Sequence, residues 1–98
     1  LVGAPVDAAR AHQLGIVNQV FSPDKLEDGT MELANRLAGA APLALRGILD
    51  CVNTGAECGI GEALEYESAQ FGLIFSTADM REGTSAFLEK RKPEFTGK

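Results

Sequence analysis

The sequence predicts a mainly α-helical chain. Apolar residues recur at three- and four-residue spacings along much of its 98 residues, as they do on one face of a helix. Prolines and glycines separate these stretches at positions where helices begin and end. One short stretch, residues 16–21, is β-branched and aromatic and favours a strand. Because a lone strand leaves its ladder groups unpaired, we expect its partner strand to lie outside this chain.

Two helices are predicted before residue 40. The first is expected over residues 4–14, where Asp7 is a plausible N-cap and Gly15 a natural residue just past the end. After the strand, Ser22-Pro23-Asp24 supplies an N-cap, a proline at the first helical position and an acid in the first turn. This second helix carries an apolar stripe, and Gly39 follows its end.

Two further helices are predicted in the middle of the chain. One begins at Pro42 and ends at residues 53–55, and Gly47 weakens its interior by up to ~1 kcal/mol relative to Ala. A loop over residues 55–61 leads to the next helix, which begins with acidic residues. That helix ends where the chain bends at residues 76–78.

A terminal helix is expected from Asp79 to Lys92. Asp79 and Glu82 have the spacing at which an N-cap side chain and an N3 carboxylate bond each other's backbone amides. Both acids would lie at the positive end of the helix dipole, and the basic residues 90–92 at its negative end. Pro93 would stop the helix, since it lacks an amide donor and disfavours the α conformation at the preceding residue.

One face of this terminal helix is the candidate ligand site. Gly83, Phe87 and Lys90 follow the spacing that places residues on one side of a helix. Gly83 would leave a shallow spot, Phe87 a flat apolar face and Lys90 an ammonium group one turn further. Such a face can receive a purine on the ring and a phosphate on the amine, and base–aromatic stacking contributes roughly 1–3 kcal/mol. The ordinary alternative is a core Phe87 and a solvated Lys90.

Charge and hydropathy exclude several classes of protein. The net charge is −5, from 14 acidic and 9 basic residues, which argues against a broad nucleic-acid-binding surface. Basic residues are concentrated in the last part of the chain, which suits a small anionic ligand, although a solvated helix end gives the same pattern. There is no apolar run long enough to span a membrane and no basic-then-apolar leader. The start at Leu1 rather than Met is what we expect from the middle of a longer protein.

No catalytic constellation is expected within residues 1–98. His12 is the only histidine, and it has no acid or cysteine patterned around it. Cys51 and Cys58 lack the further ligands of a zinc site and are expected to be reduced. Three acids could suggest paired carboxylates but fit a solvated helix start better: Glu62, Glu65 and Glu67. Neither catalytic residues nor a metal site are therefore predicted in this chain.

The order of these signals resembles the C-terminal part of the crotonase superfamily, the enoyl-CoA hydratase/isomerase family. Each motif is weak alone, but together they are specific in order and spacing. They cover residues 3–20 (GAPVDAARAHQLGIVNQV), 33–34 (LA) with 41–45 (APLAL), 67–71 (ExxxF), and 77–83 (TADMREG) with 86–91 (AFLEKR).

This resemblance implies a fold and a function. The chain would be the C-terminal helical trimerisation region of the crotonase (ClpP/crotonase-like) fold, and the N-terminal catalytic β/α core would lie upstream of residues 1–98. The parent would be an enoyl-CoA hydratase-like lyase without a permanent cofactor, whose substrates carry coenzyme A. Phe87 and Lys90 match residues that reach the adenine and phosphate end of coenzyme A, and family members form homotrimers or hexamers. No nucleic acid or membrane is implied, and the location would be cytoplasmic, or the mitochondrial matrix in a eukaryote.

Two alternatives stay open. The parent could catalyse another crotonase-type reaction, such as isomerisation, hydrolysis or a synthase step, because the upstream acids define the chemistry. A chain with no catalytic partner domain would instead be a non-catalytic helical interaction module.

Overall fold

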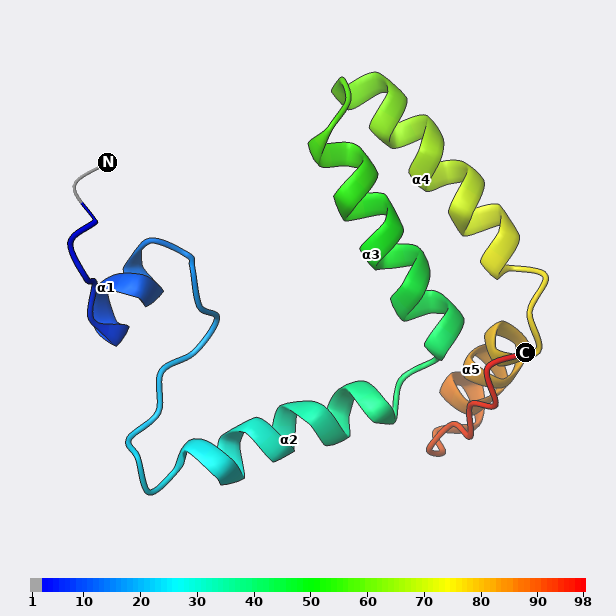
Figure 1. Cartoon of the computed structure of the whole chain (residues 1–98). Coiled ribbons are helices and arrows are strands. Elements are labelled where there is room, and N and C mark those ends of the chain that lie inside the picture. The colour runs from blue at the N-terminus through cyan, green and yellow to red at the C-terminus, as the bar shows by residue number, and fades with distance from the viewer. Residues whose placement is uncertain (1–2) are drawn as a thin grey trace. The chain divides into compact units, whose positions relative to one another are not determined.

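The computed structural model describes residues 3–98, and this part of the chain is built from helices alone (Figure 1). Within it the helices are α1 (Ala8–Gln13), α2 (Leu26–Ala38), α3 (Pro42–Ala56), α4 (Ile60–Ile74) and α5 (Ala78–Glu89). The chain divides into two compact units, with the boundary in the sequence between Arg36 and Leu37, and each unit is described separately. The mainly α fold class is confirmed.

The predicted strand at residues 16–21 is wrong. These residues form bends and irregular chain, and only Phe21 among them is half-buried. No segment within residues 3–98 is extended in a ladder that could pair with them. Side chains that favour a strand do not produce one by themselves, because the backbone amides and carbonyls must pair with those of a neighbouring strand.

Helix α1 is shorter than predicted because Asp7 caps it. The Asp7 carboxylate accepts a hydrogen bond of 2.7 Å from the Arg10 amide, and its own backbone is extended, with ψ at 169°. Residues 4–7 therefore precede the helix, and the predicted start at residue 4 is wrong. The end follows the prediction: Gly15 adopts a φ of 73°, and the amides of Gly15 and Ile16 bond back to carbonyls of the last turn.

Helix α2 begins later than predicted because the Ser-Pro-Asp sequence forms a turn. The Lys25 amide donates to the Ser22 carbonyl at 2.9 Å, with proline in the second turn position that it favours, and the helix begins at Leu26. The ring of Phe21 packs against Gly29 so closely that a Cβ atom there would overlap a ring carbon. This contact ties the irregular segment to the first turn of α2.

In the second unit, α3 and α4 run side by side as a helical hairpin (Figure 1). Pro42 occupies the first turn of α3 as predicted, and the loop to α4 is shorter than the predicted 55–61, because α3 extends to Ala56. Gly47 is buried at the contact, where an added Cβ would lie 2.9 Å from the Ile74 side chain. The glycine that weakens the isolated helix therefore lets the two helices approach.

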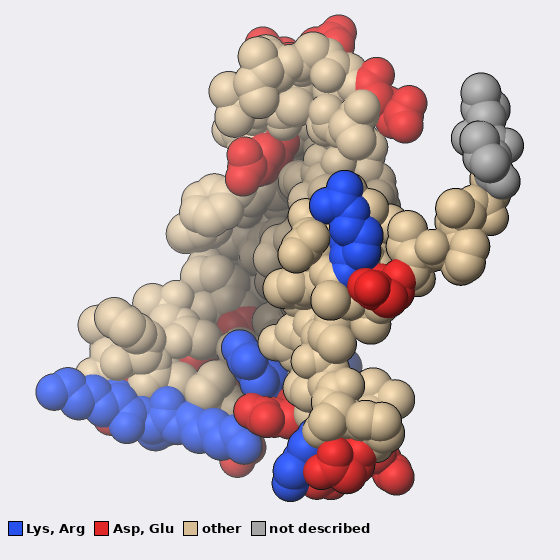
Figure 2. Space-filling model, turned by 90° about the vertical axis from the view of Figure 1, so that its left-hand side faces the viewer, with Lys and Arg blue, Asp and Glu red and all other residues tan. Residues whose placement is uncertain are grey.

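Large apolar side chains remain exposed on this hairpin. They include Ile48, Leu49, Val52, Phe71 and Leu73, each at least 58% exposed. The accessible surface of the chain is 8123 Å². Two compact globular bodies with the same total mass would together expose only roughly 6,500 Å². The chain therefore exposes more surface than two compact bodies would, even if its two units do not touch each other. Uncharged surface also dominates the face drawn in Figure 2.

None of the helices within residues 3–98 has the length and apolar character to cross a membrane.

The Gly29 contact gives a test of the first unit. Gly29→Ala would gain helix propensity of up to ~1 kcal/mol, but its methyl group must displace the Phe21 ring, and overpacking costs about 1–3 kcal/mol. We expect a net loss of stability in urea unfolding. Gly72→Ala is the matched control, since a Cβ in this α4 position meets nothing within 4 Å. Equal gains from both substitutions would show that Phe21 does not pack as described.

Candidate functional site

Helix α5 has a different N-cap from the one predicted. Thr77 caps the helix, and its hydroxyl accepts a hydrogen bond of 3.1 Å from the Met80 amide. Asp79 therefore lies inside the first turn, and its predicted role as N-cap is wrong. Because Thr77 takes the capping role, the Asp79 side chain is available for another segment.

The C-terminal end of α5 also differs from the prediction. The helix ends at Glu89, because Lys90 adopts a left-handed conformation with a φ of 55°. The Arg91 amide then bonds back to the Ala86 carbonyl at 3.0 Å and closes the last turn. The prediction of helix up to Lys92 and a stop imposed by Pro93 is wrong. The reversal at Lys90 sends the chain back along α5 (Figure 1).

Asp79 binds this returning segment. Only 3% of Asp79 is exposed, and its two carboxylate oxygens accept the amides of Thr96 at 2.7 Å and Gly97 at 2.8 Å. The Asp79 amide in turn donates to the carbonyl of Lys98 at 3.0 Å. One residue of the first turn thus satisfies three backbone groups of the C-terminal segment, and hydrogen bonds to an ionised carboxylate are among the stronger ones.

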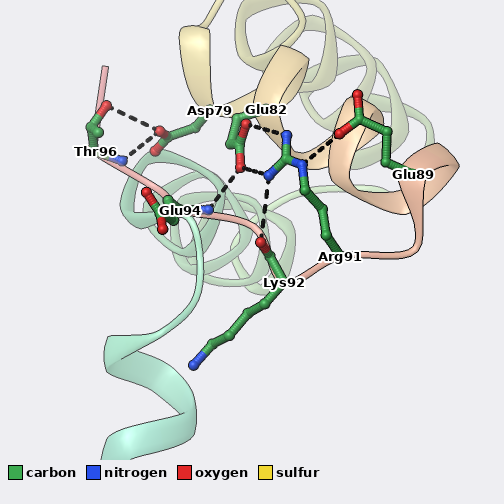
Figure 3. A network of polar contacts seen from close by, with 7 residues as sticks. All are labelled: Asp79, Glu82, Glu89, Arg91, Lys92, Glu94 and Thr96. Atoms are coloured by element: carbon green, nitrogen blue, oxygen red, sulfur yellow. Dashed lines mark hydrogen bonds and ion pairs between the residues drawn. The ribbon is translucent and has the colours of Figure 1, made fainter.

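Glu82 forms a second attachment one turn along the helix. Its carboxylate accepts the Glu94 amide at 2.8 Å and pairs with the Arg91 guanidinium, one oxygen 2.9 Å from Nη2. Arg91 also donates from Nε to Glu89 at 2.6 Å (Figure 3). The side-chain hydrogen bonds from Arg91, followed by the Glu94 amide, lower the pKa of Glu82 to about 2. This carboxylate is therefore charged at any pH near neutrality.

A groove lies between α5, the returning segment and the start of α3. Its volume is about 400 Å³, and its lining is largely apolar. Gly83, Phe87 and Phe95 line it together with Leu43 and Ile74. Phe87 is 82% exposed, so the alternative in which it is a buried core residue is wrong for the described chain. An exposed aromatic ring in a groove can stack on a planar ligand.

The structure supports the predicted face only in part. Gly83 and Phe87 do lie in one groove, but the shallow spot expected at Gly83 is covered by Phe95, whose ring would lie 3.3 Å from an added Cβ. Lys90 does not follow the helical spacing, because its left-handed backbone lies past the end of α5. It is exposed at the reversal, and the groove lining does not include it.

Sequence reasoning missed Phe95. The residue stands in an otherwise polar C-terminal segment, after a run of basic residues and Pro93. A single apolar ring in such a segment is a signal that it docks on the protein. What it docks on cannot be found from spacing, because Phe95 and Gly83 are brought together by the chain reversal.

The remaining sequence candidates lie outside this groove. His12 lines a hollow of about 440 Å³ within the first unit, beside Gln19, Glu32 and Arg36. Glu62, Glu65 and Glu67 are exposed on α4. Within residues 3–98 no group of three or more histidine, cysteine or acidic side chains is placed to hold a metal ion. Cys51 and Cys58 are half-buried free thiols.

Comparison with known proteins identifies the class to which this helical fold belongs. The sequence model of the enoyl-CoA hydratase/isomerase family matches residues 1–98. The chain belongs to this family.

Individual relatives agree. A crystal structure of enoyl-CoA hydratase subunit I from Geobacillus kaustophilus superposes with a TM-score of 0.90 at 49% identity, over 98% of this chain and 37% of that one. The short-chain-enoyl-CoA hydratase of Clostridium acetobutylicum is 39% identical over 91% of this chain and 34% of its own length. The methylmalonyl-CoA decarboxylase of Escherichia coli is 37% identical over 96% of this chain and 37% of its own length. The chain spans little more than a third of these relatives.

The low pKa of Glu82 gives a prediction about pH. The folded pKa of about 2 lies below the ordinary 4.5, so the attachment stabilises the protein above pH 4.5 and is lost as pH falls toward 2. We expect the difference in melting temperature between the native protein and Glu82→Gln to shrink over this range. Glu94→Gln removes a neighbouring charge whose side chain is exposed, and should track the native protein. A difference that is constant with pH would contradict the attachment.

Proposed function

We propose that the protein containing this chain is an enzyme acting on acyl-CoA thioesters, with hydration of a 2-enoyl-CoA as its reaction. The observation that carries the proposal is the family match over the whole chain, together with hydratases among the relatives. Residues 1–98 would contribute a contact to coenzyme A and a surface for assembly. The catalytic groups would lie in an upstream core, since the chain spans about a third of its relatives.

The proposed chemistry follows from the thioester. Two backbone amides of the upstream core would polarise the thioester carbonyl and stabilise the enolate as negative charge develops on oxygen. Upstream carboxylates would then move the protons as water adds across the double bond. The part of the molecule described here acts at the other end of the substrate, where binding energy positions the acyl group.

The coenzyme A contact is proposed for Phe87 and Lys90. Phe87 offers its exposed ring to the adenine, and stacking of this kind contributes roughly 1–3 kcal/mol. Lys90 lies three residues further, at the reversal, where its ammonium group is exposed to a phosphate. A non-glycine residue in the left-handed region costs about 1–2 kcal/mol, and such conformations occur often at functional positions.

The roles of these two residues can be tested in the whole protein. We expect Phe87→Ala and Lys90→Ala to raise KM for a CoA thioester and to leave kcat nearly unchanged. These contacts lie far from the reacting atoms, so their loss weakens binding of the substrate and of the transition state equally. Lys90→Gly separates charge from backbone strain: it also raises KM, while it stabilises the fold by removing the left-handed Lys. Lys90→Arg retains the charge and should retain most of the affinity. Unchanged KM in both Phe87→Ala and Lys90→Ala would contradict the coenzyme A contact.

Another reaction on a CoA thioester is the first alternative. The decarboxylase of Escherichia coli is nearly as similar to this chain as the hydratase of Clostridium acetobutylicum, so this region does not distinguish the two reactions. Product analysis with crotonyl-CoA separates them: 3-hydroxybutyryl-CoA supports hydration, whereas inert crotonyl-CoA favours another member reaction. A non-catalytic helical module remains the second alternative, favoured only if no CoA thioester is bound.

We further propose that the exposed hairpin face supports a homotrimer or hexamer. Ile48, Val52 and Phe71 surround an apolar hollow of about 170 Å³ between α3 and α4, and each of them is more than half exposed. An apolar surface of this extent is typical of an interface rather than of a monomer. Closed symmetric assembly would bury the same face in every subunit.

The isolated 98-residue chain tests this surface. We expect it to self-associate or to unfold at low denaturant, because its apolar faces find no partner within the chain. Sedimentation and urea unfolding at several concentrations measure this directly. Val52→Glu should abolish the association, while Glu65→Gln on the same hairpin should leave it intact. A cooperative, concentration-independent monomer would count against the assembly surface.

A further inference from the structure

The C-terminal segment is held more firmly than the end of a chain requires. Asp79 and Glu82 together bind three of its backbone amides, and the proposed function gives neither carboxylate a role. Asp79 is almost fully buried, and Glu82 is shielded by the returning segment and Arg91. A buried carboxylate is costly unless its hydrogen bonds are made, so the position of this segment is well determined.

Phe95 lies between the two attachments. The amide before it, on Glu94, donates to Glu82 at 2.8 Å, and the amide after it, on Thr96, donates to Asp79 at 2.7 Å. A residue whose two neighbours are both anchored has little freedom to swing. The close-up in Figure 3 shows the segment running from Lys92 past Glu94 to Thr96 beside the acids of α5.

The anchored ring forms part of the groove that contains Phe87. Phe95 packs against Gly83, where an added Cβ would lie 3.3 Å from its Cε1 atom. Both rings line the groove of about 400 Å³, and neither belongs to a fully buried core. Phe87 comes from the helix and Phe95 from the returning segment, so the groove has an aromatic residue from each side of the reversal.

We propose that Phe95 is a second aromatic contact for the adenine end of coenzyme A, and that Asp79 and Glu82 are positioning residues that hold it in the groove. This inference rests on the proposed function, because it adds further residues to the proposed coenzyme A binding site. Phe87 alone offers one face for stacking, and a second ring bordering the groove adds contact with the purine where water would otherwise lie. The carboxylates act through the backbone and do not touch the ligand.

The experiment uses the whole protein and two thioesters with the same acyl group, crotonyl-CoA and crotonyl-pantetheine. The second lacks the adenosine end, so a contact to adenine affects only the first. For Phe95→Ala we expect KM for crotonyl-CoA to rise roughly 5- to 150-fold, the range given by base–aromatic stacking, with kcat and both constants for crotonyl-pantetheine little changed. Phe95→Leu keeps apolar bulk on Gly83 and guards against unfolding, and it should show the same selective loss.

The positioning role is tested with Asp79→Asn and Glu82→Gln. Both should raise KM for crotonyl-CoA by less than Phe95→Ala does, with no matching rise for crotonyl-pantetheine. Hydrogen exchange at Thr96 and Gly97 should accelerate in Asp79→Asn, and exchange at Glu94 in Glu82→Gln. Glu65→Gln, an exposed carboxylate on α4 with the same charge change, should alter neither KM nor exchange.

The outcomes separate the two proposals. A selective KM increase in Phe87→Ala without one in Phe95→Ala or Phe95→Leu overturns this inference and leaves the proposed function standing. Equal losses for both thioesters show a merely structural Phe95 and also overturn it. Faster exchange in Asp79→Asn with unchanged KM for crotonyl-CoA removes the positioning role. No effect of Phe87→Ala, Lys90→Ala or Phe95→Ala on either thioester overturns the coenzyme A contact and this inference together.

Discussion

The second unit depends on how the amides of its C-terminal segment are satisfied. Residues 91–98 form no helix, so their amides need partners that regular structure does not supply. Asp79 and Glu82 supply them from the first turns of α5, at distances of 2.7 to 2.8 Å. These two carboxylates hold the segment against the helix, and with it the wall of the groove that Phe95 forms.

The left-handed Lys90 makes this arrangement possible. A helix that continued through Arg91 would carry the segment away from α5, whereas a single residue with positive φ reverses the chain within the last turn. The reversal also brings the Arg91 guanidinium against Glu82, nine residues back in the sequence. The same residue therefore ends the helix and brings the two partners of the ion pair together. Glycine would ease the backbone but would remove the charge.

The hairpin of α3 and α4 shows a second constraint: the two helices pack closely at their contact, while large apolar side chains of the same hairpin remain exposed. Gly47 allows Ile74 to approach the backbone of α3, and this fixes the two helices against each other. Val52 and Phe71, which line the hollow beside this contact, remain more than half exposed to solvent. The chain spans about a third of its family relatives and leaves this much apolar surface uncovered, and both observations support the proposed assembly surface.

The sequence by itself determined the helices and several of their ends, because Asp7, Gly15, Pro42 and Gly39 act through local backbone chemistry. It also determined the family, through motifs spread along the chain. Only the tertiary structure decided which partners Asp79 and Glu82 bind, because a capping acid and a long-range attachment have the same spacing. It also rejected the strand at residues 16–21, which depends on a pairing partner. Phe95 reaches Gly83 only through the reversal at Lys90, and no local pattern records a contact made by the returning chain.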